Sequence, residues 1–369
     1  MNKKHFFGII IVLAIALFFG NQITGDLSTE KEIKIGSILI LSGEGASWGN
    51  AARNGIDLAV DDINSNGGIN GKYLSVNHQD DKSDPKEALN AFRKLVDVDG
   101  IKFIIGTTWS HTGLPLKELA TEKKVLMVSP SLGVKEFNEY SKYLFNTWPH
   151  DFILSEQLAD LVYKKGHRRI AVFGNQNIWV KDQTNAFKKR FEGLGGIVDL
   201  ILEPNTEDTN LRPEVLKIKE SNVDAVILTN GVMNSGPIAA KRMKEIGIGL
   251  PLYSLSLDKN IIASANSAYD DLVYLTFLTP KKEFEKRYKE KFSVDIDIGG
   301  DSAYDAVMML TKAMKETRST DTEKIQEYLN GIKSYDGVSG KIISDGKGGF
   351  TKEPITMEIK NGEPIKLEK

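Results

Sequence analysis

The segment Ile33–Lys72, with the sequence IKIGSILILSGEGASWGNAARNGIDLAVDDINSNGGINGK, decides the fold. It begins with an apolar run, Ile33–Leu41, of the kind that a buried parallel strand has. A glycine-rich loop, Ser42–Gly49, follows, and then an amphipathic helix over Asn50–Asn64 that a run of asparagine and glycine ends. This order predicts the first unit of an open α/β sheet. Because such sheets bind ligands at the carboxyl ends of their strands, we expect the loop to form one wall of a ligand site.

The same loop partly matches the G-x-G-x-x-G fingerprint of dinucleotide-binding proteins. Gly43 and Gly45 fit the first two glycines, but Trp48 stands where the third must let helix and strand pack closely. Glu44 would also place a carboxylate against the pyrophosphate. A nucleotide site is therefore disfavoured. A plain structural loop and a loop that faces a small polar ligand both stay open, and the second is favoured.

The composition argues against several classes of function. The 369 residues carry a net charge of −2 with both signs interspersed, so the sequence offers no nucleic-acid-binding surface. Cysteine is absent, which excludes disulfides, thiolate metal ligands and thiol catalysis. The five histidines never pair at metal-ligand spacing, and no nucleophile elbow or phosphate-binding loop occurs. We therefore predict no metal, no cofactor and no enzymatic activity.

Residues 1–25 have the features of a signal peptide or an N-terminal anchor. Lys3 and Lys4 precede the apolar run Phe6–Phe19, which is short for a membrane span. No A-x-A cleavage pattern follows this run cleanly, so cleavage and retention both stay open. In either case, we expect the residues from Gly25 onward to be exported and to lie in the periplasm or an equivalent extracytoplasmic space.

Alternating strands and helices divide into two series. The first ends near Phe145–Asp151, which breaks the alternation and indicates a crossing to a second domain. The second series runs to Tyr274–Pro280, where the chain crosses again, and a final strand at Ile355–Ile359 implies a third crossing. The predicted fold is α/β, with two Rossmann-like lobes, parallel-rich sheets and a ligand cleft between the lobes. Residues 33–147 with 278–345 are assigned to the first lobe, and residues 148–277 with 346–369 to the second.

Two more strand ends in the first series carry polar groups suited to an anion. The strand Ile101–Gly106 is followed by hydroxyl side chains, among them Ser110, and then by a helix that begins at Pro115. Free backbone N–H groups point outward at such a helix start. Ser110 could equally serve only as a helix cap. A second turn with exposed N–H groups, Ser129–Gly133, lies at the same edge of the sheet.

Several stretches resemble the Leu/Ile/Val-binding family of solute-binding proteins that serve ABC importers, the class I periplasmic-binding fold. They occur in the family's order, run over nearly all of the chain after Ile33, and are Ile35–Gly49 with Ala59–Gly71, Asp80–Pro85, Ile104–Pro115, Val128–Ser131, Tyr304–Ala306, and Tyr335–Gly340 with Asp345–Gly349. Each stretch is loose alone, whereas their joint order and spacing is specific. The resemblance implies two α/β lobes, three crossings and a ligand closed in the cleft.

The resemblance also implies roles for matching positions. Ser110 falls where the family has a hydroxyl for the ligand carboxylate, and Ser131 where a backbone group binds it. Gly133 stands where threonine is usual and offers only its N–H, while Trp179 matches an aromatic residue of the second lobe. The full set of candidate ligand-binding residues is Ser42, Trp48, Trp109, Ser110, Ser131, Gly133, Trp179, Asn230, Ser256 and Asp258.

Ser256 departs from the family pattern. Amino-acid binders of the family carry a glutamate near this position for the ligand ammonium, and serine cannot replace its charge. A buried α-ammonium would then be poorly compensated, although Asp258 or Glu44 could substitute. The resemblance therefore supports small-ligand binding more strongly than it supports leucine binding.

We therefore predict an exported, non-enzymatic and monomeric binding protein. It captures a small polar ligand by hinge closure and delivers it to an ABC permease in the membrane. The expected ligand is a branched-chain amino acid or an amide-like relative. Two alternatives stay open, a sensor that presents the solute to a receptor or kinase, and an enzyme built on the same two-lobe scaffold.

Overall fold

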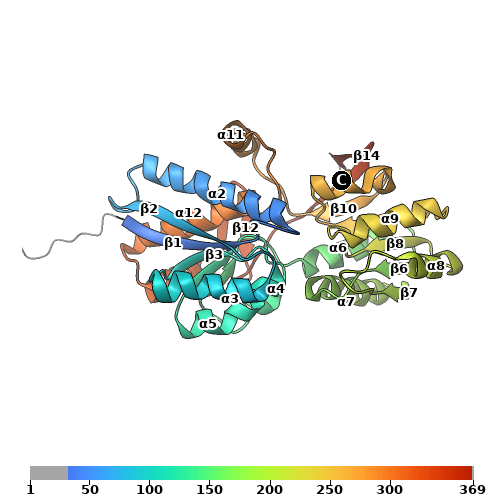
Figure 1. Ribbon diagram of the computed structural model, residues 1–369, viewed down its shortest axis with the longest axis horizontal. Helices are drawn as coiled ribbons and strands as arrows, with labels where there is room; N and C mark the ends of the chain where they lie inside the picture. The colour runs from blue at the N-terminus through green and yellow to red at the C-terminus, as the bar shows by residue number, and fades with distance from the viewer. Residues whose placement is uncertain (1–31, 368–369) are drawn as a thin grey trace, which may run out of the picture.

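The computed structural model describes residues 32–367, which form two α/β lobes side by side (Figure 1). The first lobe is built on a five-stranded parallel sheet with the order β2-β1-β3-β4-β5. Its strands are β1 (Glu32–Leu39), β2 (Tyr73–Asp80), β3 (Phe103–Gly106), β4 (Leu126–Ser129) and β5 (Leu144–Asn146). Its helices are α2 (Ala46–Ser65), α3 (Pro85–Arg93), α4 (Ser110–Gly113), α5 (Lys117–Glu122), α11 (Lys282–Phe292), α12 (Gly300–Thr317) and α13 (Thr322–Gly331).

The second lobe contains a seven-stranded sheet with the order β15-β14-β10-β9-β8-β6-β7. Its first five strands in the sequence are parallel, and the last two join antiparallel. They are β6 (Arg169–Phe173), β7 (Ile197–Leu202), β8 (Ala225–Leu228), β9 (Leu252–Leu255), β10 (Val273–Thr276), β14 (Ile355–Lys360) and β15 (Glu363–Lys366). The helices are α6 (Phe152–Lys164), α7 (Ile178–Gly193), α8 (Arg212–Glu220), α9 (Ser235–Glu245) and α10 (Lys259–Ala265).

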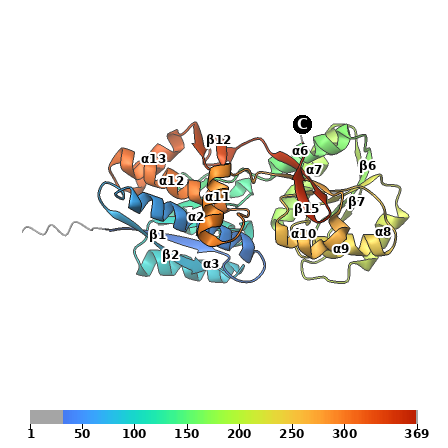
Figure 2. The same ribbon diagram turned by 90° about the horizontal axis from the view of Figure 1, so that it is seen from above.

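A small antiparallel sheet lies on the first lobe, beside α12 (Figure 2). Its strands are β11 (Ser334–Gly337), β12 (Gly340–Ser344) and β13 (Phe350–Thr351). The chain therefore passes between the lobes after β5, after β10 and after β13, as the sequence predicts. The exact lobe boundaries stay a prediction, and β13 pairs with β12 although it follows the expected boundary at residue 345.

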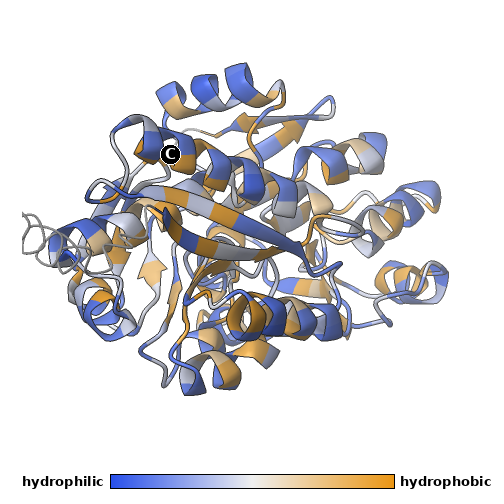
Figure 3. Cartoon of the chain, turned by 60° about the vertical axis from the view of Figure 1, so that its left-hand side comes forward, coloured by the Kyte–Doolittle hydropathy of each residue, from blue (hydrophilic) through white to orange (hydrophobic). Residues whose placement is uncertain are grey.

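Alternation of side chains along the central strands fills two hydrophobic layers in the first lobe. Ile35 and Ile105 pack with α2 and α12 on one face, whereas Ile38 and Ile104 pack with α3 and α5 on the other. All four side chains are fully buried. In Figure 3, hydrophobic residues colour much of the strands, and the helices carry both hydrophobic and hydrophilic residues. A strand buried on both faces reads as a continuous apolar run, which explains why β1 was predictable.

The glycine-rich loop is shorter than the sequence suggests, because α2 begins at Ala46 rather than at Asn50. Gly45 adopts a left-handed conformation with φ of 85° just before the helix. A Cβ atom at Gly49 would lie 1.7 Å from the carbonyl oxygen of Ile40, so Gly49 is the residue that lets helix and strand approach. The glycine that allows close packing is therefore Gly49, one position after Trp48. The indole of Trp48 lies outside the contact between strand and helix and lines the cavity between the lobes.

The helix expected to begin at Pro115 is wrong in its start, because α4 begins at Ser110 and α5 at Lys117. Three other short elements were not expected from the sequence. The segment Phe145–Asp151 was assigned wholly to a crossing, but Leu144–Asn146 forms the edge strand β5, which is too short to show a period. Helix α10 and strand β15 were likewise missed. The predicted signal or anchor in residues 1–25 lies outside the described residues.

The first crossing is built around the buried carboxylate of Asp151. The indole N–H of Trp148 donates to Asp151 Oδ1 at 2.9 Å, and that of Trp179 donates to Oδ2 at 2.7 Å. The Asp151 amide donates to the carbonyl of Gly133 at 2.9 Å. Burial raises the pKa of Asp151 to about 6, and the two indole hydrogen bonds act in the opposite direction. The carboxylate thereby connects the first lobe, the crossing and the second lobe.

Gly133→Ala should destabilise the protein by about 1–3 kcal/mol, a typical cost of overpacking. A Cβ atom at this position would lie 1.8 Å from Asp151 Oδ2, in a site where both carboxylate oxygens are held by indoles. Gly193→Ala is the control, because a Cβ at this last residue of α7 meets nothing within 4 Å. Urea unfolding measures both variants. Equal free energies of unfolding would show that the carboxylate moves aside without cost.

Asp151→Asn should flatten the dependence of stability on pH. Between the unperturbed pKa of 3.8 and the folded pKa of about 6, the folded protein binds more protons at Asp151 than the unfolded chain does. Deprotonation of Asp151 therefore lowers the free energy of unfolding of the wild type as the pH rises across that window, by about 3 kcal/mol in total. Urea unfolding at pH 4 and pH 7 measures the difference, with Asp61→Asn, an exposed site, as control. Parallel profiles for wild type and Asp151→Asn would contradict the assignment.

Candidate ligand-binding site

A narrow cavity lies between the two lobes. Both lobes contribute to its wall at the carboxyl ends of their parallel strands, which is where the sequence places the site. The first lobe supplies Trp48, Trp109, Ser110, His111 and Ser131, and the second supplies Asn177, Trp179, Val232 and Met233. Five of the ten predicted site residues therefore line the same cavity.

Ser110 presents a hydroxyl group without a partner. It is the first residue of α4, directly after the turn that follows β3, and only 2% of its surface is exposed. Its Oγ atom has no hydrogen-bond partner among the described residues. The alternative that Ser110 merely caps a helix is not supported by this geometry, because no side-chain cap bond forms at this helix. A buried hydroxyl that lines a cavity and lacks a partner is suited to a polar ligand atom.

The turn after β4 contributes through Ser131 but not through Gly133. The hydroxyl of Ser131 donates to the carbonyl of Thr108 at 2.8 Å, so it fixes the two turns to each other. Gly133 is absent from the cavity wall, and its carbonyl accepts the Asp151 amide. The Asp151 carboxylate occupies the space that a side chain at position 133 would fill. Threonine, which is usual here in the family that the sequence resembles, would collide with it.

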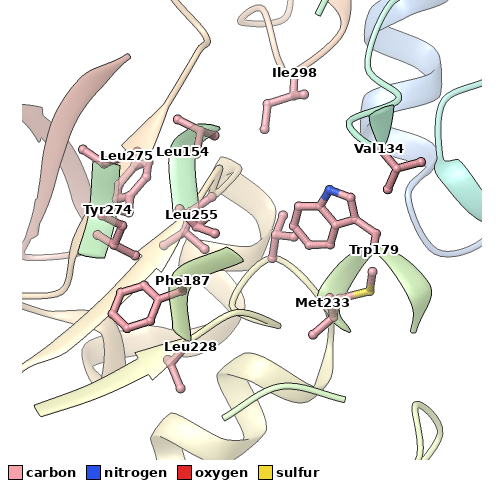
Figure 4. Close-up of a cluster of buried hydrophobic side chains, with 14 of the residues drawn as sticks. Val134, Leu154, Trp179, Phe187, Leu228, Met233, Leu255, Tyr274, Leu275 and Ile298 are labelled. Atoms are coloured by element: carbon pink, nitrogen blue, oxygen red, sulfur yellow. The ribbon is translucent and has the colours of Figure 1, made fainter. Parts of the chain in front are cut away.

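Three tryptophans form the aromatic part of the wall. The rings of Trp48 and Trp109 stand almost perpendicular, at 87° with centroids 6.1 Å apart. Trp179 lies opposite on the second lobe, next to Met233 at the edge of the buried cluster in Figure 4. The indole N–H of Trp48 donates to Asp258 Oδ2 at 3.1 Å, and that of Trp179 donates to Asp151. Both indoles are therefore held at their nitrogen by a buried carboxylate.

Asp258 and Ser256 lie after β9 but outside this cavity. Asp258 caps α10 by accepting from the Ile261 amide at 2.9 Å, and it faces a neighbouring hollow next to Trp48. Burial raises the pKa of its carboxyl, against the hydrogen bonds from Ile261 and Trp48. Ser256 is buried with φ of 48°, and its Oγ has no partner among the described residues. Neither residue is on the wall of the cavity itself.

Ser42 and Asn230 were also expected at the site, and the structure places them elsewhere. Ser42 is exposed and donates to Asp80 Oδ2 at 2.6 Å. Asn230 is buried and donates to Ser235 Oγ at 2.9 Å, behind the turn that carries Val232. Both follow predicted strand ends, but a strand end has several residues and the sequence does not say which one turns inward.

Four wall residues were missed by the sequence analysis, namely His111, Asn177, Val232 and Met233. His111 Nε2 lies 3.0 Å from the carbonyl oxygen and 3.2 Å from the hydroxyl oxygen of Ser83. Asn177 caps α7 by accepting from the Trp179 amide at 2.9 Å. In the sequence, only their position after strand ends indicates that these four residues lie at the cavity.

Polar contacts join the lobes around the cavity. Besides the Trp48–Asp258 bond, the amide of Asn234 donates to Glu44 Oε1 at 3.2 Å, and Lys259 Nζ lies 2.6 Å from Asp295 Oδ2. The Glu44 carboxylate therefore accepts a hydrogen bond from the Asn234 backbone amide, and Glu44 does not line the cavity. The two lobes are in contact on the side of the cavity where α2 meets the turns before α9 and α10.

Among residues 32–367, no group of three or more histidine, aspartate or glutamate side chains is placed to hold a metal ion. Within the same residues, no helix has both the length and the apolar character needed to cross a membrane.

Comparison with known proteins gives a consistent result. The sequence model of the Periplasmic binding protein family matches residues 32–363. The chain is 26% identical over 345 residues to the Leu/Ile/Val-binding protein BraC3 of Rhizobium johnstonii, which covers 88% of this chain and 91% of that protein. It is also 26% identical over 358 residues to the leucine-, isoleucine-, valine-, threonine- and alanine-binding protein of Pseudomonas aeruginosa, covering 94% and 93%.

Solved structures show the same fold. The branched-chain amino acid transporter substrate binding protein LivJ of Streptococcus pneumoniae, in complex with isoleucine, superposes with a TM-score of 0.82 at 22% identity, covering 91% of this chain and all of that one (100%). A solute binding protein of an ABC transporter from R. palustris, in complex with 4-hydroxybenzoate, gives 0.83 at 20% identity, covering 91% and 96%. Because the family match extends over almost every described residue, the chain belongs to the periplasmic binding protein family.

Proposed function

We propose that this chain is an exported solute-binding protein that closes around a small ligand and delivers it to an ABC importer. The observation that carries the proposal is the cavity between the lobes, with the unpartnered Ser110 hydroxyl on one side and aromatic side chains around the rest. A site divided between two lobes releases its ligand when the lobes separate. The names of its relatives, which bind leucine, isoleucine and valine, support the same role.

The ligand fits best as a small amphipathic molecule with an anionic end. Ser110 would donate to a carboxylate or carbonyl oxygen, while Trp48, Trp109 and Trp179 would cover an apolar body. Branched-chain amino acids and amide-like relatives meet this description. The bond from Trp48 to Asp258 forms across the lobes and would stabilise the closed state.

The wall lacks an acid for a primary ammonium group. None of the nine wall residues is aspartate or glutamate. Asp258 and Glu44 lie outside the cavity, where Asp258 accepts from the Trp48 indole and Glu44 from the Asn234 amide. A bound α-ammonium would have no carboxylate on the wall to balance its charge, which is costly when the group is buried. The free α-ammonium is therefore not required for binding, which agrees with the departure at Ser256.

Closure would occur at the three crossings, which bend while the lobes stay rigid. The first of them carries Asp151, and the lobes would comprise residues 33–147 with 278–345 and residues 148–277 with 346–369, except that β13 stays with the first lobe. The N-terminal segment would direct the chain out of the cytoplasm, by cleavage or as an anchor. The partner would be an ABC permease, and the protein would act as a monomer without catalysing a reaction on its ligand.

A ligand screen tests the function. Branched-chain amino acids, their amides and their deaminated acids, and aromatic carboxylates are incubated with the protein, and thermal unfolding is recorded. A ligand present at 100 times its Kd should add about 2.7 kcal/mol of stability. The effect should be lost in Trp109→Ala and kept in Tyr140→Ala, whose aromatic ring is 99% exposed. Absence of any stabilisation, or turnover of the ligand seen by mass spectrometry, would contradict the proposal.

Ser110→Ala should weaken binding of a carboxylate ligand by about 1–3 kcal/mol, as for a hydrogen bond to a charged group. Stability without ligand should change by less than about 0.5 kcal/mol, because the Oγ atom has no partner to lose. Ser42→Ala, an exposed site outside the cavity, is the control and should leave affinity unchanged. Calorimetry gives both affinities. Unchanged affinity in Ser110→Ala would remove this residue from the site.

A further inference from the structure

We propose that the ligand of this site is a small carboxylate that carries a fully N-alkylated ammonium group, that is, a betaine, held by the three tryptophans and Ser110. The inference rests on the proposed function and adds the chemical class of the ligand. Three observations carry it, namely the angle between the aromatic walls, the carboxylates behind the indoles, and the absence of a carboxylate on the wall itself.

The aromatic walls form a corner rather than a slot. Trp48 and Trp109 stand at 87° with centroids 6.1 Å apart, and Trp179 closes the cavity from the other lobe. A flat aromatic ligand stacks best between parallel faces, which these two rings do not provide. A rounded group of methyls around a positive centre contacts several rings at once, and aromatic cages bind quaternary ammonium ions in this way.

Two buried carboxylates make the cavity favourable for a cation. Asp258 accepts from the Trp48 indole at 3.1 Å, and Asp151 accepts from the Trp179 indole at 2.7 Å. Burial raises the pKa of Asp151 to about 6, so this carboxylate is charged at pH 7.5. No lysine or arginine lies on the cavity wall; the basic side chains near these carboxylates are His111 on the wall and His150 beside Asp151. A positive charge between the indoles is therefore attracted by the rings and by the carboxylates behind them.

The same carboxylates cannot accept a hydrogen bond from the ligand. They lie outside the wall, and indole N–H groups already occupy them. The amide oxygen of Asn177 is also engaged, by the amide of Trp179. A primary ammonium would bring three N–H donors to a wall whose side-chain acceptors are the Ser110 and Ser131 hydroxyls and the His111 imidazole, with no carboxylate to balance its charge. A trimethylammonium group keeps the positive charge, so the rings and the carboxylates attract it. It has no N–H group and therefore leaves no donor unpaired.

The opposite end of the ligand is fixed by Ser110. Its buried Oγ has no partner among the described residues and lies on the same wall as Trp109. A carboxylate a few bonds from the ammonium would accept this hydrogen bond while the methyl groups contact the rings. Such a ligand carries its own counter-charge and does not need the acidic residue that amino-acid binders use.

The test compares two molecules of the same shape. Glycine betaine and 3,3-dimethylbutanoate differ only in that a carbon replaces the charged nitrogen, so their difference in affinity reports the charge. Calorimetry at pH 7.5 should show at least tenfold tighter binding of glycine betaine, the scale of a desolvated cation–π contact. Glycine betaine should also bind more tightly than L-valine, whose ammonium has N–H groups.

A pair of variants tests the buried charge. Asp258→Asn keeps an amide oxygen for the Trp48 indole but removes the charge, and should weaken glycine betaine several-fold while leaving 3,3-dimethylbutanoate unchanged. The control is Asp160→Asn on α6, a partly exposed ion pair with Arg190, which should change neither affinity. Near-ultraviolet circular dichroism verifies that both variants keep the native packing.

Each contrary outcome has a distinct meaning. Equal or tighter binding of 3,3-dimethylbutanoate would overturn the inference in favour of an uncharged apolar acid. Tighter binding of L-valine would overturn it in favour of a primary amine and an acceptor that moves into the site. In both cases the proposed solute-binding function would stand, because a ligand still binds between the lobes. Failure of these three probes together with the whole ligand screen would overturn the betaine inference and the proposed function alike.

Discussion

The hydrogen bonds between indole N–H groups and buried carboxylates are the interactions on which the site depends. Asp151 holds Trp148 and Trp179 at the first crossing, and Asp258 holds Trp48 across the lobes. A buried carboxylate is costly unless its oxygens are satisfied, so each arrangement has few alternatives. The bonds to Asp151 therefore fix Trp179, and with it one aromatic wall, before a ligand enters, whereas the bond from Asp258 holds Trp48 only when the lobes are closed. Such preorganisation reduces the entropy that binding costs.

The fold was predictable because its elements are long and periodic or fully apolar. The run Ile33–Leu41 and the helix that follows it predict the first strand–helix unit. Repetition of this unit along the chain in two series predicts the two lobes. Elements of few residues, such as β5 and β15, have no period to detect and were missed. The start of α2 was misplaced because Gly45 and Gly49 look alike in sequence, while one ends the loop and the other allows close packing.

The position of the cavity at the strand ends was predictable, whereas only part of its wall was. Ser110, Ser131 and the three tryptophans follow strand ends or begin helices, and these positions converge in any sheet of this kind. Gly133 was expected to offer its N–H to a ligand, but Asp151, 18 positions later, fills the space beside it. Contacts between residues so far apart arise from the path of the crossing. Local sequence patterns do not contain that information, and the same holds for Asp258 and Trp48.

The central claim is that ligand binds between the indoles and Ser110, and a crystal structure of the complex tests it most directly. The compound that stabilises the protein most against thermal unfolding is used. We predict that it lies between the rings of Trp48, Trp109 and Trp179, with its anionic group hydrogen-bonded to Ser110 Oγ. A ligand located instead in the separate groove lined by Tyr274, Lys282 and Met357 would contradict the account.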